Sequence, residues 1–597
     1  MGAHRFDLQH GAALTVRRTS PRMVALLCCA LLAPLWLVAM FHRGLWTPDE
    51  PREADITWRM SQQSDLAVPT LAGTPFLEKP PLAYWAGAVA ASLAPDHVAA
   101  LRAPNFLFAC FATLAVAALA FAGAGRSAAI VAALASGTFL LALQVASWLA
   151  TDAAMMAGVA CALLGFYRGF QAPRGLRKLA WYALMHVALA WAFLAKGPAS
   201  WLVPVTAAAG LIVFERAWRE LLRWELWTPF LIPLAVILAW SLSVAGAQSG
   251  AHSLAVLLWY NVAGRVVSLN APDAASYAQA HRNWPGKYFI EGVFYLAPWT
   301  FLFLAAARRA WFAIREPDSP RLWRFAVCAW AVPLVALSFA GTGRGIYAAP
   351  TLPAAAVLIG LWFAERQAIP DRFERAMLRA TYWFVAVIAV VLFAAAALLQ
   401  MSEGALWGAL PILLAGIVVV LVALARGRRF AREQRWQPYF VTLCTAFVCA
   451  VVASGWVMFP VIDRWQDISS VVRQIDRDTQ DRSLALFGPD ETTIALVDLY
   501  APLHRGRWHI HTPGSDLEAV VVLLPGHASG PLSDMLRGWG FKGPKPPLAP
   551  EATPILKQLA ADPGLVLERV YEVPHGRRYA VLAPKATVQP SSTARSP

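Results

Sequence analysis

Residues 23–53 read MVALLCCALLAPLWLVAMFHRGLWTPDEPRE, a stretch in which an apolar run leads directly into a group of charged residues. The apolar part, 23–41, is long enough to cross a bilayer as a helix. The charged part, Trp46-Thr-Pro-Asp-Glu-Pro-Arg-Glu53, then begins the first loop outside the membrane. Further along this loop, Phe76-Leu-Glu-Lys-Pro-Pro-Leu-Ala-Tyr-Trp85 adds a glutamate-lysine pair. The sequence therefore predicts a membrane helix followed by a charged loop at the membrane surface.

The rest of the chain continues this apolar character. Of its 597 residues 58% are hydrophobic and 15% charged, and the mean hydropathy is +0.50. This composition excludes an assembly of soluble domains and predicts an α-helical polytopic membrane protein. Apolar runs close to the length of a membrane span occur about thirteen times, at 23–41, 100–124, 128–148, 153–167, 179–195, 199–214, 226–246, 289–306, 325–340, 347–363, 380–399, 405–425 and 438–459.

The distribution of arginine and lysine predicts the orientation. Basic residues are concentrated in the loops between alternate spans and in the segment before the first span. The positive-inside rule places this side in the cytoplasm, and an odd number of spans puts the chain after 459 outside. The net charge of +15 follows from this orientation and does not indicate nucleic-acid binding. No small-residue cleavage site follows the first span, so we expect an uncleaved signal anchor.

Three parts of the chain are predicted to have structure outside the membrane. We expect a transmembrane domain over 1–459 with outward loops at 42–99 and 247–288. Within the first loop, helices over about 51–62 and 82–94 would lie in the plane of the membrane interface. The third part is an α/β domain over 460–584, followed by a disordered tail over 585–597 that is rich in Ser, Thr and Pro.

The α/β domain has its own pattern of elements. Pro489-Asp-Glu-Thr492 looks like the first-loop motif, but at the start of a soluble helix it indicates an N-cap. The last two predicted strands are separated by Pro574-His-Gly576 and should form a hairpin. The predicted elements are a helix over 466–479 and strands over 483–487, 520–524, 565–573 and 578–582.

Three acidic residues are candidates for catalysis. Asp49 and Glu50 stand at the start of the helix expected near Pro51, where either could simply cap the helix and be stabilised by its dipole. Asp152 lies in the tight turn Ala150-Thr-Asp152 between two spans, on the same outward side, and could cap the next span. An acidic residue at a span boundary is costly, which favours function. We therefore predict catalytic roles for Asp49, Glu50 and Asp152.

Four cations are expected to face outward near these spans, where the orientation rule disfavours them. They are Lys79, Lys196, Arg265 and Arg344. A phosphate group in a site of low dielectric needs such partners, with Arg in a bidentate contact and Lys as a point charge. Lys196 could equally be a lysine that extends its amine from a helix end to the interface. The set predicts a site for a phosphorylated substrate that lies in the membrane.

Glu78 and His281 are a possible pair of metal ligands. Two residues from distant loops are a weak signal, and a solvated histidine is the alternative. All seven cysteines fall within predicted spans, so neither a disulfide framework nor a cysteine-rich zinc site is expected in the outward parts.

Taken together, these motifs resemble those of the bacterial aminoarabinose transferase family. The resemblance is strong over about 40–200 and thinner over 260–363. It implies a GT-C type glycosyltransferase fold, related to the protein O-mannosyltransferases, with a C-terminal periplasmic α/β domain. The matching residues are Trp46-x-Pro-Asp-Glu50, Phe76-Leu-Glu-Lys-Pro-Pro-Leu-x-Tyr-Trp85, Leu101-Arg-Ala-Pro104, Thr151-Asp152, Lys196-Gly-Pro198 and Gly343-Arg-Gly-Ile-Tyr347.

The resemblance implies an activity and a location. The family transfers 4-amino-4-deoxy-L-arabinose from undecaprenyl phosphate to lipid A phosphate at the periplasmic face of the bacterial inner membrane, which gives polymyxin resistance. We expect a monomer with a cytoplasmic N-terminus. The chain departs from the family at Arg52-Glu-Ala-Asp55, where members have Arg-Tyr-Ala-Glu, and at Arg344, where they have a lysine. These departures leave the sugar and the acceptor open.

The resemblance also implies roles for individual residues. Asp49 would be the catalytic carboxylate of the first loop and Asp152 its partner, with Glu50 beside them. Glu78 with His281 would match the family's metal pair, for a divalent cation such as zinc. The donor phosphate would be held by Lys79, Arg265, Tyr347, Arg52 and Lys196.

The chemistry of such a transfer agrees with these residue types. Displacing a lipid phosphate from an anomeric carbon builds positive charge on the sugar and negative charge on the leaving phosphate. Carboxylates suit the first and Lys or Arg the second. Transfer to a protein or another glycan is an alternative, and so are a lipid-linked sugar transporter and a receptor. A lipid-linked sugar transporter would instead carry charges near mid-span. Because the charges cluster at the outer face, an enzyme is favoured.

Overall fold

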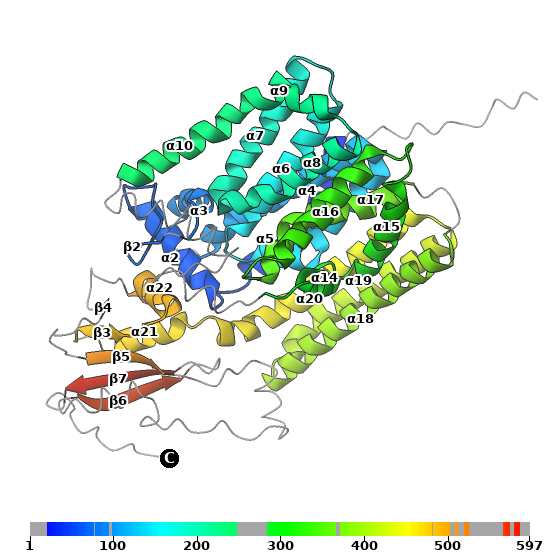
Figure 1. The fold of residues 1–597 in the computed structure, drawn as a ribbon. Helices are drawn as coiled ribbons and strands as arrows, with labels where there is room; N and C mark the ends of the chain where they lie inside the picture. The colour runs from blue at the N-terminus through cyan, green and yellow to red at the C-terminus, as the bar shows by residue number, and fades with distance from the viewer. Residues whose placement is uncertain are drawn as a thin grey trace, which may run out of the picture.

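The protein consists of a bundle of long helices with a small sheet domain at one end (Figure 1). The structure is a computed structural model. It describes residues 21–584 except for 77, 95–97, 247–282, 366–369, 480–481, 502–507, 511–518, 525–564 and 573–577. The predicted tail over 585–597 and most of the outward loop over 247–288 lie outside these residues.

Within the described ranges, nine helical segments are long and apolar enough to cross a membrane. Three shorter apolar segments accompany them: the later part of α1 (Pro21–Phe41), α3 (Leu82–Leu93), and η1 (Pro198–Trp201) with α8 (Leu202–Phe214). The nine are α4 (Val98–Thr138), α6 (Asp152–Gln171), α7 (Leu176–Lys196), α9 (Trp224–Trp227) to α10 (Leu231–Gly246), α16 (Arg321–Ser338), η5 (Gly345–Thr351) with α17 (Leu352–Ala364), α18 (Arg372–Ser402), α19 (Leu406–Arg432) and α20 (Trp436–Gln466).

The predicted helical class is confirmed, and three predicted spans differ in their detail. The runs over 100–124 and 128–148 correspond to α4 and α5 (Leu140–Ser147), with a break inside α4 at Gly125, where φ is 76°. Only glycine adopts such a φ at little cost. The run over 289–306 is divided between α14 (Lys287–Tyr295) and α15 (Thr300–Ala313). The number of membrane crossings therefore stays a prediction.

Small residues let the helices of the bundle approach closely. α17 lies in its centre, buried along nearly its whole length, and packs against α4. A Cβ at Gly360 would lie 2.6 Å from the Ala128 carbonyl oxygen, and one at Gly165 would lie 2.6 Å from the Met185 amide nitrogen of α7. Both glycines are therefore required by the backbone of the neighbouring helix, as is usual where helices pack in a membrane.

The first outward loop folds into two short helices. α2 (Asp49–Gln62) and α3 pack against each other, and the strands β1 (Thr70–Leu71) and β2 (Thr74–Pro75) form a small hairpin between them. Both predicted helices of this loop are confirmed. The burial of α2 is not what its sequence suggests, because Glu50, Arg52, Glu53 and Asp55 are all buried.

The C-terminal domain is an α/β domain, as predicted. Its five-stranded sheet has the order β4-β3-β5-β7-β6, with β3, β4 and β5 parallel and β6 and β7 a final antiparallel hairpin. Residues such as Leu484, Val472 and Leu496 form the core between the sheet and its helices. The elements are α21 (Ser469–Asp478), β3 (Leu484–Phe487), α22 (Glu491–Tyr500), β4 (Trp508–Ile510), β5 (Ala519–Leu524), β6 (Leu565–Glu572) and β7 (Arg578–Pro584).

The last membrane helix continues directly into the C-terminal domain. α20 has no break at the predicted boundary near 459 and remains helical to Gln466. Its end contacts the first loop: the Gly44 amide and the Trp46 indole both donate to Asp463 Oδ1, at 2.8 and 2.7 Å. A Cβ at Gly44 would meet the Asp467 carboxylate, so a larger residue here would have to displace that side chain. The C-terminal domain is therefore joined to the first loop as well as to the bundle.

Candidate active site

Asp49 is a partly exposed carboxylate at the start of the first-loop helix. It is the first residue of α2, where Pro48 is the N-cap and no side chain makes a capping hydrogen bond. Its two carboxylate oxygens each lie 3.2 Å from a guanidinium nitrogen, one of Arg52 and one of Arg344. The side chain of Asp49 is 23% exposed and that of Arg344 37%. The predicted carboxylate thus lies between two cations and remains open to a ligand.

Glu50, the next residue, has the opposite surroundings. Its side chain is fully buried and is surrounded by donors: the guanidiniums of Arg43 and Arg102 and the backbone amides of Trp46 and Leu149, at 2.8 and 2.9 Å. Burial opposes ionisation, but the two arginines outweigh it and lower the pKa of Glu50 to about 2. Both oxygens are already engaged by protein groups, so this geometry suits an anchor better than a base.

A second buried group surrounds Glu53, one turn further along α2. The carboxylate pairs with the Lys79 amine and accepts a hydrogen bond from the Tyr84 hydroxyl at 2.8 Å. Arg52 also approaches it at 3.5 Å. Although burial opposes ionisation, Lys79 and Arg52 hold the pKa of Glu53 below its usual range. The predicted phosphate-binding Lys79 is therefore placed beside Arg52 by a carboxylate that the sequence analysis did not select.

Asp152 and Lys196 form a direct ion pair between the start of α6 and the end of α7. Asp152 is the first residue of its helix, and no side chain caps that helix. Both side chains are largely buried. The Lys196 amine therefore binds a carboxylate and does not simply extend from the helix end to the membrane interface.

The segment just before Asp152 is fastened to the first loop. Besides the Leu149 amide bound to Glu50, the Ser147 carbonyl accepts from Arg43 at 2.9 Å, and the Trp148 carbonyl accepts from Asn105 at 2.6 Å. Three successive residues are thus held in place shortly before the Asp152 carboxylate. This arrangement brings Asp152 and Asp49, the two predicted catalytic carboxylates, into one region of the molecule.

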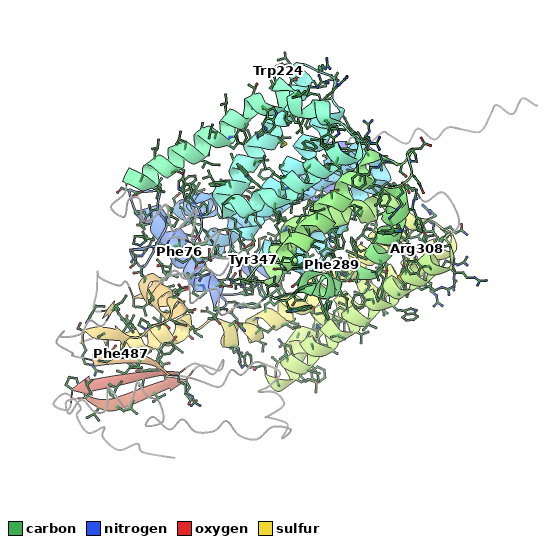
Figure 2. All side chains as sticks on the ribbon, viewed as in Figure 1. Phe76, Trp224, Phe289, Arg308, Tyr347 and Phe487 are labelled. Atoms are coloured by element: carbon green, nitrogen blue, oxygen red, sulfur yellow. The ribbon has the colours of Figure 1, made fainter. Side chains whose placement is uncertain are left out.

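The segment around Arg344 and Tyr347 completes this region. The Tyr347 amide donates to the Arg344 carbonyl at 3.0 Å, and η5, which contains Tyr347, packs against α5 and α6. Figure 2 shows Tyr347 and Phe76 at the end of the bundle that faces the C-terminal domain. Arg344, one of the four predicted outward cations, lies in this segment and pairs with Asp49.

The C-terminal domain contributes a contact that the sequence did not reveal. Glu491, the first residue of α22, accepts from Arg52 at 2.7 Å, and the Thr492 hydroxyl donates to the Pro48 carbonyl at 3.1 Å. The predicted N-cap is confirmed, because Asp490 accepts from the Thr493 amide at 2.9 Å. Arg52 therefore contacts carboxylates from two domains. The sequence marks Glu491 only as part of an N-cap motif, because its partner Arg52 is distant in the sequence.

Two predicted residues, Arg265 and His281, lie outside the described residues. Glu78 is described and half-buried, next to Lys79. In the described part of the chain, no group of three or more His, Cys, Asp or Glu side chains is arranged to hold a metal ion. The metal pair and the contact of Arg265 with phosphate stay predictions.

Comparison with known proteins finds relatives of this chain. The family profile described as dolichyl-phosphate-mannose-protein mannosyltransferase matches residues 78–242. An undecaprenyl phosphate-α-4-amino-4-deoxy-L-arabinose arabinosyl transferase of Serratia proteamaculans is 26% identical over 444 residues, covering 72% of this chain and 75% of that protein. The protein of the same name from Pseudomonas aeruginosa is 27% identical over 341 residues, covering 55% and 58%.

Solved structures share the fold. The crystal structure of ArnT from Cupriavidus metallidurans bound to undecaprenyl phosphate superposes with a TM-score of 0.67 at 17% identity, covering 93% of this chain and 97% of that one. The oligosaccharyltransferase of Archaeoglobus fulgidus gives a TM-score of 0.50 at 14% identity, covering 83% and 64%. This chain is therefore similar in sequence to the bacterial aminoarabinose transferases and the protein mannosyltransferase family, and it has the GT-C fold.

Proposed function

We propose that this protein transfers 4-amino-4-deoxy-L-arabinose from undecaprenyl phosphate to a phosphate of lipid A. The names of its relatives support the donor and the sugar. The single observation that carries the proposal is the Asp49 carboxylate, which lies between Arg52 and Arg344 and remains partly exposed. It combines a negative group for the sugar with cations for phosphate in one place.

The cations of this region can bind the donor phosphate. Lys79, Lys196 and Arg52 each pair with a carboxylate. A phosphate oxygen of the lipid-linked sugar can compete with these carboxylates for the same cations. Tyr347 and Arg265 are proposed to complete the phosphate site. Such charge-assisted contacts are strongest when they are shielded from water, as in the partly buried loops around α2.

The proposed reaction forms one bond to the anomeric carbon of the sugar and breaks another. An oxygen of the acceptor phosphate attacks the anomeric carbon, and the bond from that carbon to the donor phosphate breaks with its electron pair on the leaving oxygen. The acceptor phosphate is largely deprotonated at neutral pH, since its second pKa is about 6, so no strong base is needed. Asp49 then stabilises the positive sugar carbon or orients the acceptor. With a hydroxyl acceptor Asp49 would have to remove a proton.

The protein is a multi-pass inner-membrane protein. We propose that its N-terminus is cytoplasmic and that the active site and the C-terminal domain are periplasmic, because the arginine-rich loops lie on the opposite side of the spans. We also propose that it acts as a monomer on two lipid substrates.

A divalent cation, with zinc as the first candidate, is proposed at Glu78 and His281. Glu78 fits such a role in so far as it is half-buried and adjacent to Lys79. One carboxylate and one imidazole leave coordination positions open, and a bound cation supplies positive charge for a phosphate. Glu78 would then orient the Lys79 segment of the first loop.

Mass spectrometry of lipid A and of total glycoprotein, from cells with and without the protein, tests the function. We expect a mass increase on lipid A phosphate that depends on the protein and is lost in the Asp49→Asn variant. An increase on glycoprotein with unchanged lipid A would indicate a protein acceptor instead. No change in either fraction, with the protein present in the membrane, would contradict the proposal.

A further inference from the structure

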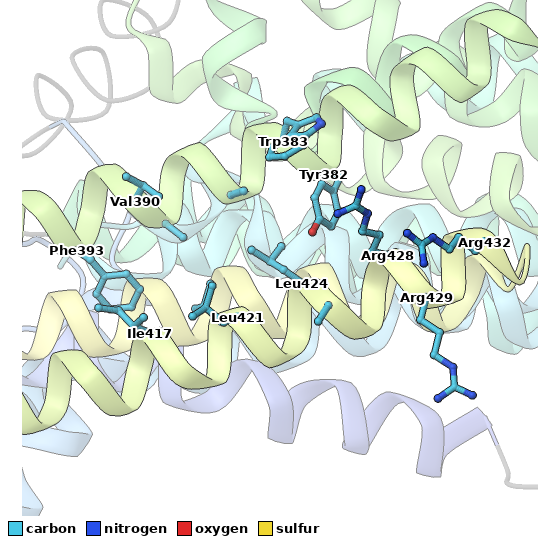
Figure 3. Close-up of a pocket in the computed structure, with 14 residues that line it drawn as sticks. Tyr382, Trp383, Val390, Phe393, Ile417, Leu421, Leu424, Arg428, Arg429 and Arg432 are labelled. Atoms are coloured by element: carbon cyan, nitrogen blue, oxygen red, sulfur yellow. The ribbon is translucent and has the colours of Figure 1, made fainter.

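A groove of about 660 Å³ lies between α18 and α19, among the described residues of these two helices. Its walls are apolar over most of their length, with side chains such as Phe393, Ile417 and Leu421. Figure 3 shows these side chains along the two helices and three arginines gathered at one end. The groove is remote in the sequence from the first-loop carboxylates and takes no part in the proposed reaction.

The arginines at the end of the groove are Arg428, Arg429 and Arg432, all of them exposed. Arg429 pairs with Glu433 at 2.7 Å. Arg428 and Arg432 have no ion pair with any residue that the structure describes. Tyr382 and Trp383 of α18 also line this part of the groove, where an aromatic belt is expected near a membrane surface.

Two arginines of other helices, Arg309 of α15 and Arg324 of α16, are compensated by carboxylates. Arg309 pairs with Glu316 and Glu365, and Arg324 pairs with Glu215. The helix dipole and the orientation rule explain why basic residues end α19. They do not explain why Arg428 and Arg432 line the end of an apolar groove.

We propose that this groove binds an anionic phospholipid, with its acyl chains against the apolar walls and its phosphate at Arg428 and Arg432. The lining has the two chemistries of such a lipid in the right order, an apolar length and a cationic end. Basic pockets between membrane helices are a recurrent way of binding anionic headgroups. The lipid would hold α18 and α19 together at the arginine-rich end.

Native mass spectrometry of the full-length protein tests the proposal, after reconstitution in nanodiscs with equal amounts of phosphatidylglycerol and phosphatidylcholine. We expect retained phosphatidylglycerol on the wild type. The double variant Arg428→Gln/Arg432→Gln should retain it about thirtyfold more weakly, which corresponds to about 2 kcal/mol. Arg426→Gln is the matched control, because Arg426 is exposed on the same helix but does not line the groove.

A second variant keeps the charge and fills the groove. Ala386→Phe should displace the acyl chains and reduce retention while all three arginines remain. A separate arm with inorganic phosphate alone distinguishes a lipid site from a simple anion site: we expect no measurable binding. Equal retention of the two lipids, equal loss in the Arg426 control, no loss in Ala386→Phe, or tight binding of free phosphate would each overturn the proposal.

Discussion

At the scale of single residues, Asp49 and Glu50 have different environments although they are neighbours in the sequence. Asp49 is partly exposed and contacts two cations, whereas Glu50 is buried and surrounded by donors. Removing the charge of Asp49 costs little stability, because partly exposed ion pairs are worth only about 0.2–1 kcal/mol. Removing the charge of Glu50 leaves the buried guanidinium groups of Arg43 and Arg102 without their carboxylate partner.

We therefore predict that Asp49→Asn lowers turnover at least about a hundredfold with little change in melting temperature. Asp152→Asn should also be impaired. Glu50→Gln should instead destabilise the protein by about 3–5 kcal/mol, as is usual when one partner of a buried pair is lost. Turnover of reconstituted protein and its thermal unfolding in detergent are the measurements. Near wild-type turnover in both aspartate variants would show that these residues are not catalytic.

The phosphate site makes a prediction about binding. Lys79→Ala should weaken binding of undecaprenyl phosphate by about 1.5–3 kcal/mol, because a charge-assisted contact is lost, and Arg265→Ala should act in the same way. Calorimetry with the free lipid phosphate measures the affinity. Arg482→Ala is the control, since Arg482 pairs with Glu568 at the far side of the C-terminal sheet. Unchanged affinity in both test variants would remove these residues from the site.

For the metal, we predict that purified wild-type protein contains a divalent cation that is reduced in His281→Ala. Two ligands from different loops cannot bind a cation well when one is removed. Elemental analysis of both proteins gives the answer directly. The same metal content in each, or transfer that is indifferent to chelators and to this substitution, would leave Glu78 and His281 as ordinary loop residues.

At the scale of elements, α22 of the C-terminal domain packs on α2 of the first loop. Glu491 binds Arg52, and Arg52 in turn binds Asp49. We predict that Glu491→Gln lowers kcat severalfold with little change in donor KM, since Arg52 loses one of its fixed partners. Glu491→Asp should restore part of kcat. Steady-state kinetics separates these cases, and an unchanged kcat in Glu491→Gln would mean that Arg52 is positioned without α22.

The same interface contains two neighbouring acids, Asp55 and Asp498, beside Arg59. Burial and the nearby Asp498 raise the pKa of Asp55 well above its usual range. A raised folded-state pKa gives stability that is complete below about pH 4 and is lost as the pH rises through the folded pKa. Asp55→Asn should therefore gain melting temperature over the wild type as the pH rises. Asp65→Asn, at an exposed acid, should show no such trend.

The elements themselves were largely predictable, and their partners were not. Apolar period and length predicted α2, α3, α21 and the C-terminal hairpin, because these signals are local. The burial of Glu50 depends on Arg102, from another helix, and the role of Glu491 depends on Arg52 at the other end of the chain. Such contacts are set by tertiary packing, so a single sequence contains no periodic sign of them.

At the scale of the whole molecule, the candidate site is assembled from segments that are far apart in the chain. Asp152, Lys79 and Lys196 were predictable because charged groups are rare at span boundaries and cations are rare on the outward side, and Asp49 was predictable from the first-loop motif. Arg344 was predicted to face outward for the same reason, and in the structure it pairs with Asp49. What the sequence lacked was the pairing, since each carboxylate could have met any of several cations.

The junction of α20 with the first loop affects how this protein can be recombined with its relatives. Asp463 at the end of that helix binds Gly44 and Trp46, while Glu491 and Asp498 bind Arg52 and Arg59. A chimera that exchanges only the C-terminal domain would break all of these contacts at once. We therefore expect a functional chimera only when residues 42–99 and 460–584 are taken together from the same protein.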